Sequence, residues 1–322
     1  MTTKAACATL AGVTIVAAAV AWGGKGGAVT KVNGTAWRNS LADALKESKR
    51  TGKPVLYLSM FGKLDEEMPC ANARTLRATL FKDPEFSKFV QNEAIPAWEM
   101  VRPVPHVTID FGDGKNVVRT VRGNAVMYLV NSDGKVFDAF PGVYTKDDFL
   151  PAVRESISKL AKADDAEVRE YHQKNAAPIR RTLFTTSKLV LEGPTLRLMN
   201  APAIKGFQPP VQTVADPSKT KFLREASRLA DSSLTPATAQ EAVGTAGASG
   251  KTPEELAQSI LQRDSRLNME RTRNVVHFYF ASEKKLPTPA EARDAVLGTI
   301  LKIPYKDPTM GLSEVLLPGT PR

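Results

Sequence analysis

The sequence predicts an α/β fold, with helices packed on a sheet, followed by a smaller and mainly helical domain. In the first half, short apolar runs of strand length alternate with segments of helical spacing. Interleaved helices and strands of this kind are typical of an α/β layer fold. After residue 192, prolines punctuate a stretch with little periodicity, and clear helix-start signals follow it.

Each element of the α/β half has its own local signal. Strand-length apolar runs and Asp-Gly turns predict a strand over 54–60 and two hairpins, over 107–118 and 126–140. Apolar residues at helical spacing predict helices over 37–52, from 70 to 81, over 83–90 and over 146–162. The third begins at Asp83-Pro84, and Thr145 precedes the fourth.

The second half has helix-start signals of one type. Segments beginning at Asp216, Thr252 and Thr288 each place a proline at the first helical position, and a Glu follows three residues after each of the two threonines. This is the capping-box arrangement. Only the run 275–280 fits a strand equally well. We therefore expect a helix and a proline-rich linker over 164–217 and a helical domain over 218–322.

The charge balance argues against a nucleic-acid partner. The chain has 44 Lys and Arg against 34 Asp and Glu, which gives a formal charge of +10. The basic residues are spread thinly, and the densest spots are only pairs. A nucleic-acid binder usually gathers its positive charge into a stripe with aromatic stacking partners. We therefore expect no nucleic-acid binding.

The N-terminus has the layout of a secretory signal peptide. Lys4 precedes an uncharged run from Ala5 to Ala21, which ends in a small-x-small site. We predict a signal peptide over 1–21, a flexible segment over 22–34 and the α/β domain over 35–163. The protein would then be exported to a periplasmic or other extracytoplasmic compartment. The alternative is an uncleaved anchor, in which case this segment is the membrane attachment.

Removal of the leader leaves Cys70 as the lone cysteine, so the mature chain cannot form an internal disulfide. In an oxidising compartment, a lone thiol is buried, paired between chains, or reactive. The three histidines have no Cys or acidic neighbours at metal-ligand spacing. We expect no metal and no cofactor.

The residues around Cys70 resemble a known family. The register runs from Pro69-Cys70 through Ala73-Arg74, Leu76 and Phe81 to Asp83-Pro84. It resembles the Trp-Cys-x-x-Cys segment of exported and cytoplasmic thioredoxin-like proteins, in which a basic residue, Leu, Phe and Asp-Pro follow at fixed offsets. The segments 52–56 and 123–135 resemble the same family. The likeness covers about residues 35–160 and implies a thioredoxin-like three-layer domain. The Phe81 and Asp83 offsets disfavour an alternative register with Cys70 as the second cysteine.

Two departures from the family pattern affect the chemistry. Cys70 falls on the family's nucleophilic position, but Ala73 stands where the resolving thiol would be, and Ala125 replaces the family's cis-proline. Without a resolving thiol the protein cannot release a mixed disulfide by itself, which excludes ordinary dithiol exchange. A small thiol or a partner protein would have to do so.

Two functional hypotheses follow. In the first, Cys70 is a monothiol nucleophile toward a disulfide, a peroxide or a partner thiol. A helix N-terminus and Arg74 would lower its pKa, and Asn72 would supply a polar contact. Against this, the acidic run 65–67 would raise the pKa, and a buried cysteine would be inert. In the second reading, the chain is a non-catalytic thioredoxin-fold binding or scaffold protein of the cell envelope.

Overall fold

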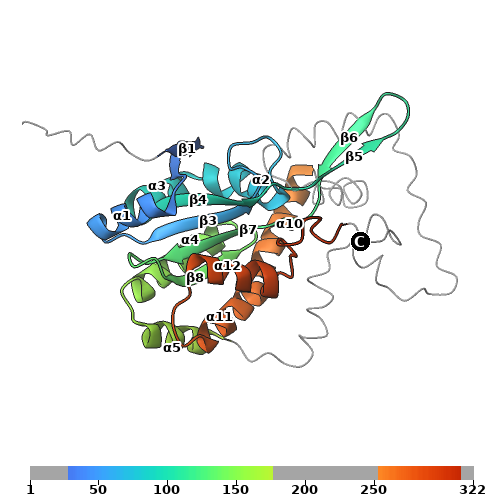
Figure 1. The fold of residues 1–322 in the computed structure, drawn as a ribbon. Coiled ribbons are helices and arrows are strands. Elements are labelled where there is room, and N and C mark those ends of the chain that lie inside the picture. The colour runs from blue at the N-terminus through green and yellow to red at the C-terminus, as the bar shows by residue number, and fades with distance from the viewer. Residues whose placement is uncertain (1–27, 177–252, 313–322) are drawn as a thin grey trace, which may run out of the picture.

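The computed structural model describes residues 28–176 and 253–312 (Figure 1). The predicted leader, residues 177–217 of the predicted linker and the helix start at Asp216 lie outside these ranges. The first range contains β1 (Val29–Val32), β2 (Thr35–Arg38), α1 (Leu41–Thr51), β3 (Val55–Phe61), α2 (Ala71–Ala78), the 3-10 helix η1 (Leu80–Lys82), α3 (Pro84–Asn92), β4 (Ile95–Arg102), β5 (His106–Asp110), β6 (Asn116–Thr120), β7 (Ala125–Val130), β8 (Val136–Pro141), α4 (Lys146–Leu160) and α5 (Asp165–Asn175). The second contains α10 (Pro253–Leu267), the π-helix η2 (Asn268–Thr272), α11 (Arg273–Ser282), α12 (Pro289–Arg293) and the π-helix η3 (Asp294–Ile300).

A six-stranded mixed sheet forms the centre of the protein, in the order β1-β2-β4-β3-β7-β8. The strands β2, β4 and β3 run parallel, whereas β1, β7 and β8 each pair antiparallel with a neighbour. Every residue of β3, β7 and β8 is buried. Continuous apolar runs such as Val55–Leu58 suit this position because helices cover both sheet faces.

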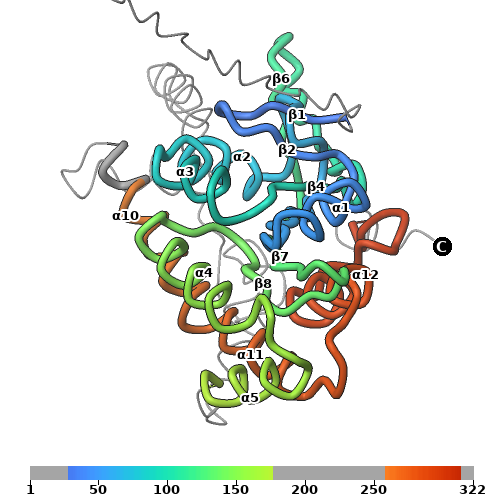
Figure 2. Tube along the Cα trace, turned by 90° about the vertical axis from the view of Figure 1, so that its left-hand side faces the viewer, coloured from blue at the N-terminus to red at the C-terminus, as the bar shows by residue number. Residues whose placement is uncertain are grey.

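The helices pack on both faces of the sheet, so the fold is mixed α/β. Figure 2 shows α3 and α4 on one side and α1 and α12 on the other. Aromatic rings fill the first interface: Phe86 and Phe89 of α3 lie 6.1 and 6.5 Å from the ring of Phe149 in α4. Aromatic pairs at this spacing contribute beyond the area they bury. This sheet and its helices hold the start of α2 in place.

The local predictions are confirmed for most elements, are wrong for two, and do not include strand β4. Trp37 belongs to strand β2, not to the first helix, because Ser40 caps α1 and accepts from the Asp43 N–H. Residues 29–34 form β1 and a tight turn, where the sequence predicts a flexible segment. Strand β4 was not predicted. Both hairpins, the strand over 54–60 and the helices after Asp83 and Thr145 are confirmed.

The C-terminal helices pack directly on the sheet. The segment 275–280 is helical, and α11 lies against edge strand β8 and helix α5 (Figure 1). The buried apolar cluster runs without interruption from the sheet residues to Val276, Phe280 and Val296. Residues 253–312 therefore complete the hydrophobic core of the α/β unit.

The hairpin β5–β6 forms a separate two-stranded sheet that projects from the body (Figure 1). Phe111, at the end of this hairpin, is 62% exposed. Within the two described ranges, no helix combines the length and the apolar character needed to cross a membrane.

Candidate functional site

Cys70 stands at the start of α2, as the sequence predicts. It is the N-cap residue of the helix, and its own backbone N–H donates to the Phe61 carbonyl at 3.0 Å. The Arg74 N–H then donates to the Cys70 carbonyl at 3.1 Å, which begins the helical ladder. The thiol is therefore placed by the end of β3 and the first turn of α2.

The thiol itself is closed off from solvent. Cys70 is 0% exposed, and its Sγ donates to the Asn124 carbonyl at 3.3 Å. Gly123 covers it so closely that a Cβ at residue 123 would lie 3.0 Å from the Cys70 Cβ, and its φ of +92° suits glycine. Burial raises the pKa of the Cys70 thiol, and this effect outweighs the helix-start N–H groups and Arg74, which lower it. The helix start and Arg74 act in the predicted direction, but the expected net lowering of the pKa is wrong.

The other two predicted site residues lie beside Cys70 but serve local structure. Asn72 Nδ2 donates to the Asn124 side-chain oxygen at 2.6 Å, so Asn124 receives bonds from both Cys70 and Asn72. Arg74 donates to the Thr120 hydroxyl at 3.2 Å, at the base of the projecting hairpin. The structure therefore brings all three together, with Asn124 as the residue that joins two of them.

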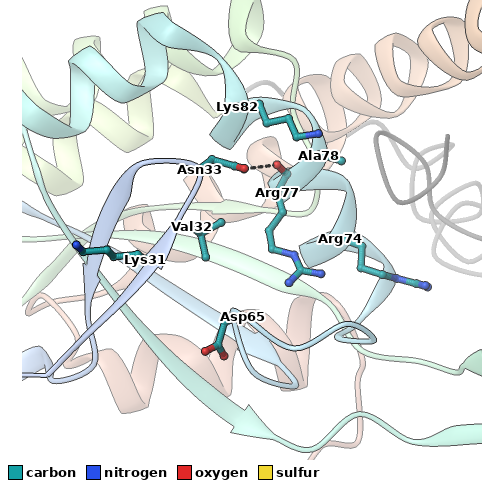
Figure 3. A pocket seen from close by; sticks show the side chains of 8 residues that line it. All are labelled: Lys31, Val32, Asn33, Asp65, Arg74, Arg77, Ala78 and Lys82. Carbon is teal, nitrogen blue, oxygen red and sulfur yellow. Dashed lines mark hydrogen bonds between the residues drawn. The ribbon is translucent and has the colours of Figure 1, made fainter. Parts of the chain in front are cut away.

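A small hollow of about 270 Å³, called the basic hollow below, lies beside α2 (Figure 3). Its walls are formed by the end of β1 with the turn after it, by α2, by η1 and by the loop that follows β3. The lining residues are Lys31, Val32, Asn33, Asp65, Arg74, Arg77, Ala78 and Lys82. Four of these eight carry a positive charge and one carries a negative charge.

Two side chains join the walls of this hollow. Asn33 sits in the β1–β2 turn with φ +48°, followed by Gly34 with φ +80°, which is the geometry of a two-residue hairpin turn. Its side-chain amide donates to the Arg77 carbonyl at 2.5 Å. Arg77 in turn donates through Nη1 to the carbonyls of Leu64 and Glu66, at 3.0 and 2.7 Å. The turn, α2 and the loop are thereby held in one arrangement.

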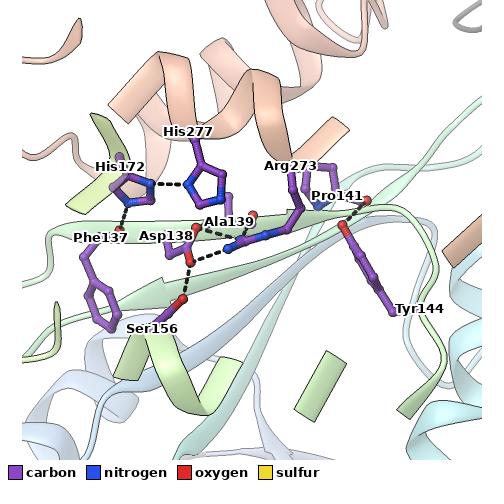
Figure 4. A network of polar contacts seen from close by, with 9 residues as sticks. All are labelled: Phe137, Asp138, Ala139, Pro141, Tyr144, Ser156, His172, Arg273 and His277. Atoms are coloured by element: carbon purple, nitrogen blue, oxygen red, sulfur yellow. Dashed lines mark hydrogen bonds and ion pairs between the residues drawn. The ribbon is translucent and has the colours of Figure 1, made fainter. Parts of the chain in front are cut away.

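A buried polar network links the sheet to the C-terminal helices (Figure 4). Asp138 of β8, 0% exposed, accepts from Nη1 and Nη2 of Arg273 at 2.8 and 3.1 Å and from the Ser156 hydroxyl at 2.5 Å. Burial pushes the pKa of Asp138 upward, but Arg273 overcomes this and lowers it to about 2. The Arg273 guanidinium also lies 3.9 Å from the centre of the Phe140 ring. This ion pair fixes α11 against β8.

Two histidines extend the network. His172 Nε2 faces the Phe137 carbonyl at 2.9 Å, so this nitrogen must donate. In neutral His172 the other nitrogen, Nδ1, is then an acceptor, and it accepts a hydrogen bond from the N–H of His277 Nδ1 at 2.7 Å. Burial lowers the pKa of His172, and burial together with Arg273 lowers the pKa of His277 to about 4. Both rings are thus neutral, hydrogen-bonded core residues.

No metal-binding group emerges from the part of the chain that the structure describes: no three His, Cys, Asp or Glu side chains there are arranged to hold an ion.

Comparison of the chain with protein-family models, with characterised protein sequences and with solved structures finds no match.

Sequence reasoning missed the basic hollow. Its residues come from four separate places between positions 31 and 82, and none forms a local motif. The signal that was available is the Asn33-Gly34 pair, which is typical of a hairpin turn. That turn carries Lys31 and Asn33 to α2, but the sequence does not indicate where the turn docks.

Proposed function

We propose that this chain is a non-catalytic, exported binding protein built on a thioredoxin-like domain. The observation that carries the proposal is the burial of Cys70. A redox thiol needs a thiolate and an open path to its substrate. Cys70 has a raised pKa, is fully buried and donates to the Asn124 carbonyl.

The order of the strands supports the thioredoxin-like part of the proposal. Two parallel crossovers, from β2 to β3 and from β3 to β4, are followed by the antiparallel hairpin β7–β8 and then by α4. A thioredoxin-like domain has this arrangement, with its active position at the helix start after the central strand. Cys70 holds that position, and the segment with Ala125 in place of proline begins β7 beside it.

The replaced residues also fit a binding role. With Ala73 at the resolving position, a thiol at Cys70 has no internal partner. Ala73 is itself buried, so it fills the core where the family has a second sulfur. The scaffold keeps its packing while the exchange chemistry is absent.

The experiment that tests this proposal is thiol alkylation as a function of pH. The C7S chain is used so that Cys70 is the one reactive cysteine, and folded protein is compared with protein in denaturant. We expect Cys70 in the folded protein to be alkylated at least about a hundredfold more slowly than in the denatured chain, because modification requires local opening.

Folded and denatured rates within about threefold of each other at pH 7–8, or a folded pKa below that of the denatured chain, would refute the proposal. Either result would restore the monothiol reading, in which Cys70 attacks a disulfide, a peroxide or a partner thiol. The C7S/C70A chain gives the background rate.

A further inference from the structure

We propose that the basic hollow beside α2 binds carboxylate groups of an extended acidic segment in a partner protein. The inference rests on the proposed binding function and names the chemistry of the partner. The site is separate in its contacts from the Cys70 thiol, which is enclosed by Phe61, Gly123 and Asn124.

The charge of the hollow favours an anion. The residues that line this hollow of about 270 Å³ carry an excess of three positive charges. Lys31 and Lys82 are exposed at its rim, and Arg74 and Arg77 of α2 are half-buried. Charges of one sign lining a concave surface concentrate ligands of the opposite sign and speed their association.

The hollow is pre-organised by hydrogen bonds from side chains to backbone carbonyls. Asn33 ties the β1–β2 turn to α2, and Arg77 ties α2 to the loop of Leu64 and Glu66. The binding surface therefore does not have to be assembled when a ligand arrives, which lowers the entropic cost of association.

The arrangement of the cations favours several separate carboxylates over one small anion. Figure 3 shows the side chain of Lys31 extending to one side and those of Lys82 and Arg74 extending to the other. A single phosphate would need donors that converge on one point. An extended acidic segment can instead place one carboxylate near each cation.

The lining also favours a peptide over a nucleic acid. None of the eight lining residues is aromatic, so no ring is available for base stacking. Val32 and Ala78 add small apolar surfaces suited to aliphatic side chains. Strand β1 lies at the edge of the sheet and pairs there only with β2 among the described strands, so an extended chain can align beside it.

The test measures binding of a fluorescein-labelled hexaglutamate peptide to the full chain by fluorescence anisotropy. The variant K31E/K82E reverses both rim charges. The variant K49E/K162E is the matched control, because it reverses two exposed lysines on α1 and after α4 and changes the net charge equally. Circular dichroism checks that both variants are folded.

We expect K31E/K82E to weaken binding by about tenfold or more, and K49E/K162E by less than about twofold. The D65N variant, which removes the carboxylate of the hollow, should bind the peptide more tightly. Equal weakening by both double variants would overturn the proposal, because it would show an effect of net charge alone. No measurable binding by the unaltered chain would also overturn it.

A six-nucleotide oligothymidylate serves as a competitor of similar charge. If it binds more tightly than hexaglutamate with the same dependence on Lys31 and Lys82, the acidic-peptide proposal is wrong and the site belongs to a nucleic acid. None of these measurements involves the thiol. They can therefore fail while the alkylation result stands, and the reverse is equally true.

Discussion

Replacement of Arg273 by methionine should destabilise the whole α/β unit. Arg273 is 3% exposed and Asp138 is 0% exposed, and two hydrogen bonds join them across α11 and β8. Methionine fills much of the arginine volume but removes the charge. The variant R273M therefore leaves a buried carboxylate without its cation.

The expected cost is about 3–5 kcal/mol, because removal of one partner of a buried ion pair leaves an uncompensated charge. The contacts with Ser156 and the Ala139 N–H remain and keep the loss near the lower end. The double variant D138N/R273M removes the charge as well as its partner. It should recover about 1–3 kcal/mol of the loss.

Urea unfolding at pH 7, followed by tryptophan fluorescence, measures both variants. Trp37 and Trp98 lie in β2 and β4, far along the chain from Arg273. Their transition moves in R273M only if the C-terminal helices stabilise the sheet. Without Arg273, burial raises the pKa of Asp138, so protonation at low pH becomes favourable in the folded state. The gap between R273M and the unaltered protein should thus shrink as the pH falls toward 4.

Two results would refute this reasoning. One is a loss below about 1 kcal/mol in R273M, which would mean that the ion pair is solvated or dispensable. The other is a double variant less stable than the single one, since the buried charge would then not be the source of the cost. An unchanged tryptophan transition with an early loss of helical circular dichroism would instead indicate an independent helical domain.

Three further predictions concern stability. The pKa of His277 is about 4 in the folded state against 6.5 in the unfolded state, so the unfolded state binds more protons between these pH values. The free energy of unfolding should therefore fall by about 3 kcal/mol from pH 7 to pH 4. The variant H277F should show a smaller fall in its urea midpoint over the same pH range. The variant G123A should lose about 1–3 kcal/mol in urea, because its φ is +92° and its new Cβ would meet Cys70; unchanged stability would mean that this loop is loosely packed. The variant T288A should lose about 1 kcal/mol by removing a capping box. A thermal scan that shows no loss relative to the unaltered chain would contradict this.

The sequence predicted the elements whose signals are local. The apolar run of β3 and the two Asp-Gly hairpins could be located because burial on both faces and tight turns each select particular residues. The helix starts at Asp83, Thr145 and Thr288 could be located because a capping side chain acts within three residues.

The missed elements depend on distant partners. Strand β4 contains Pro96 and Glu99 and has no clear alternation, and it is a strand because β2 and β3 pair with it on either side. Trp37 has helical spacing relative to Leu41, but the pairing of β2 with β1 and β4 places it in the sheet. Propensity is a weak prior that such tertiary contacts override.

The sequence by itself determined the mixed α/β class and placed Cys70 at a helix start, because both follow from local spacing and capping. The tertiary structure decided whether that thiol could react. Gly123 and Asn124, more than fifty residues away, cover Cys70, and the resulting loss of solvation outweighs the helix dipole. The basic hollow and the Asp138–Arg273 pair likewise exist only once distant segments meet. Desolvation and charge complementarity arise from residues that are neighbours in space, and sequence spacing alone does not report them.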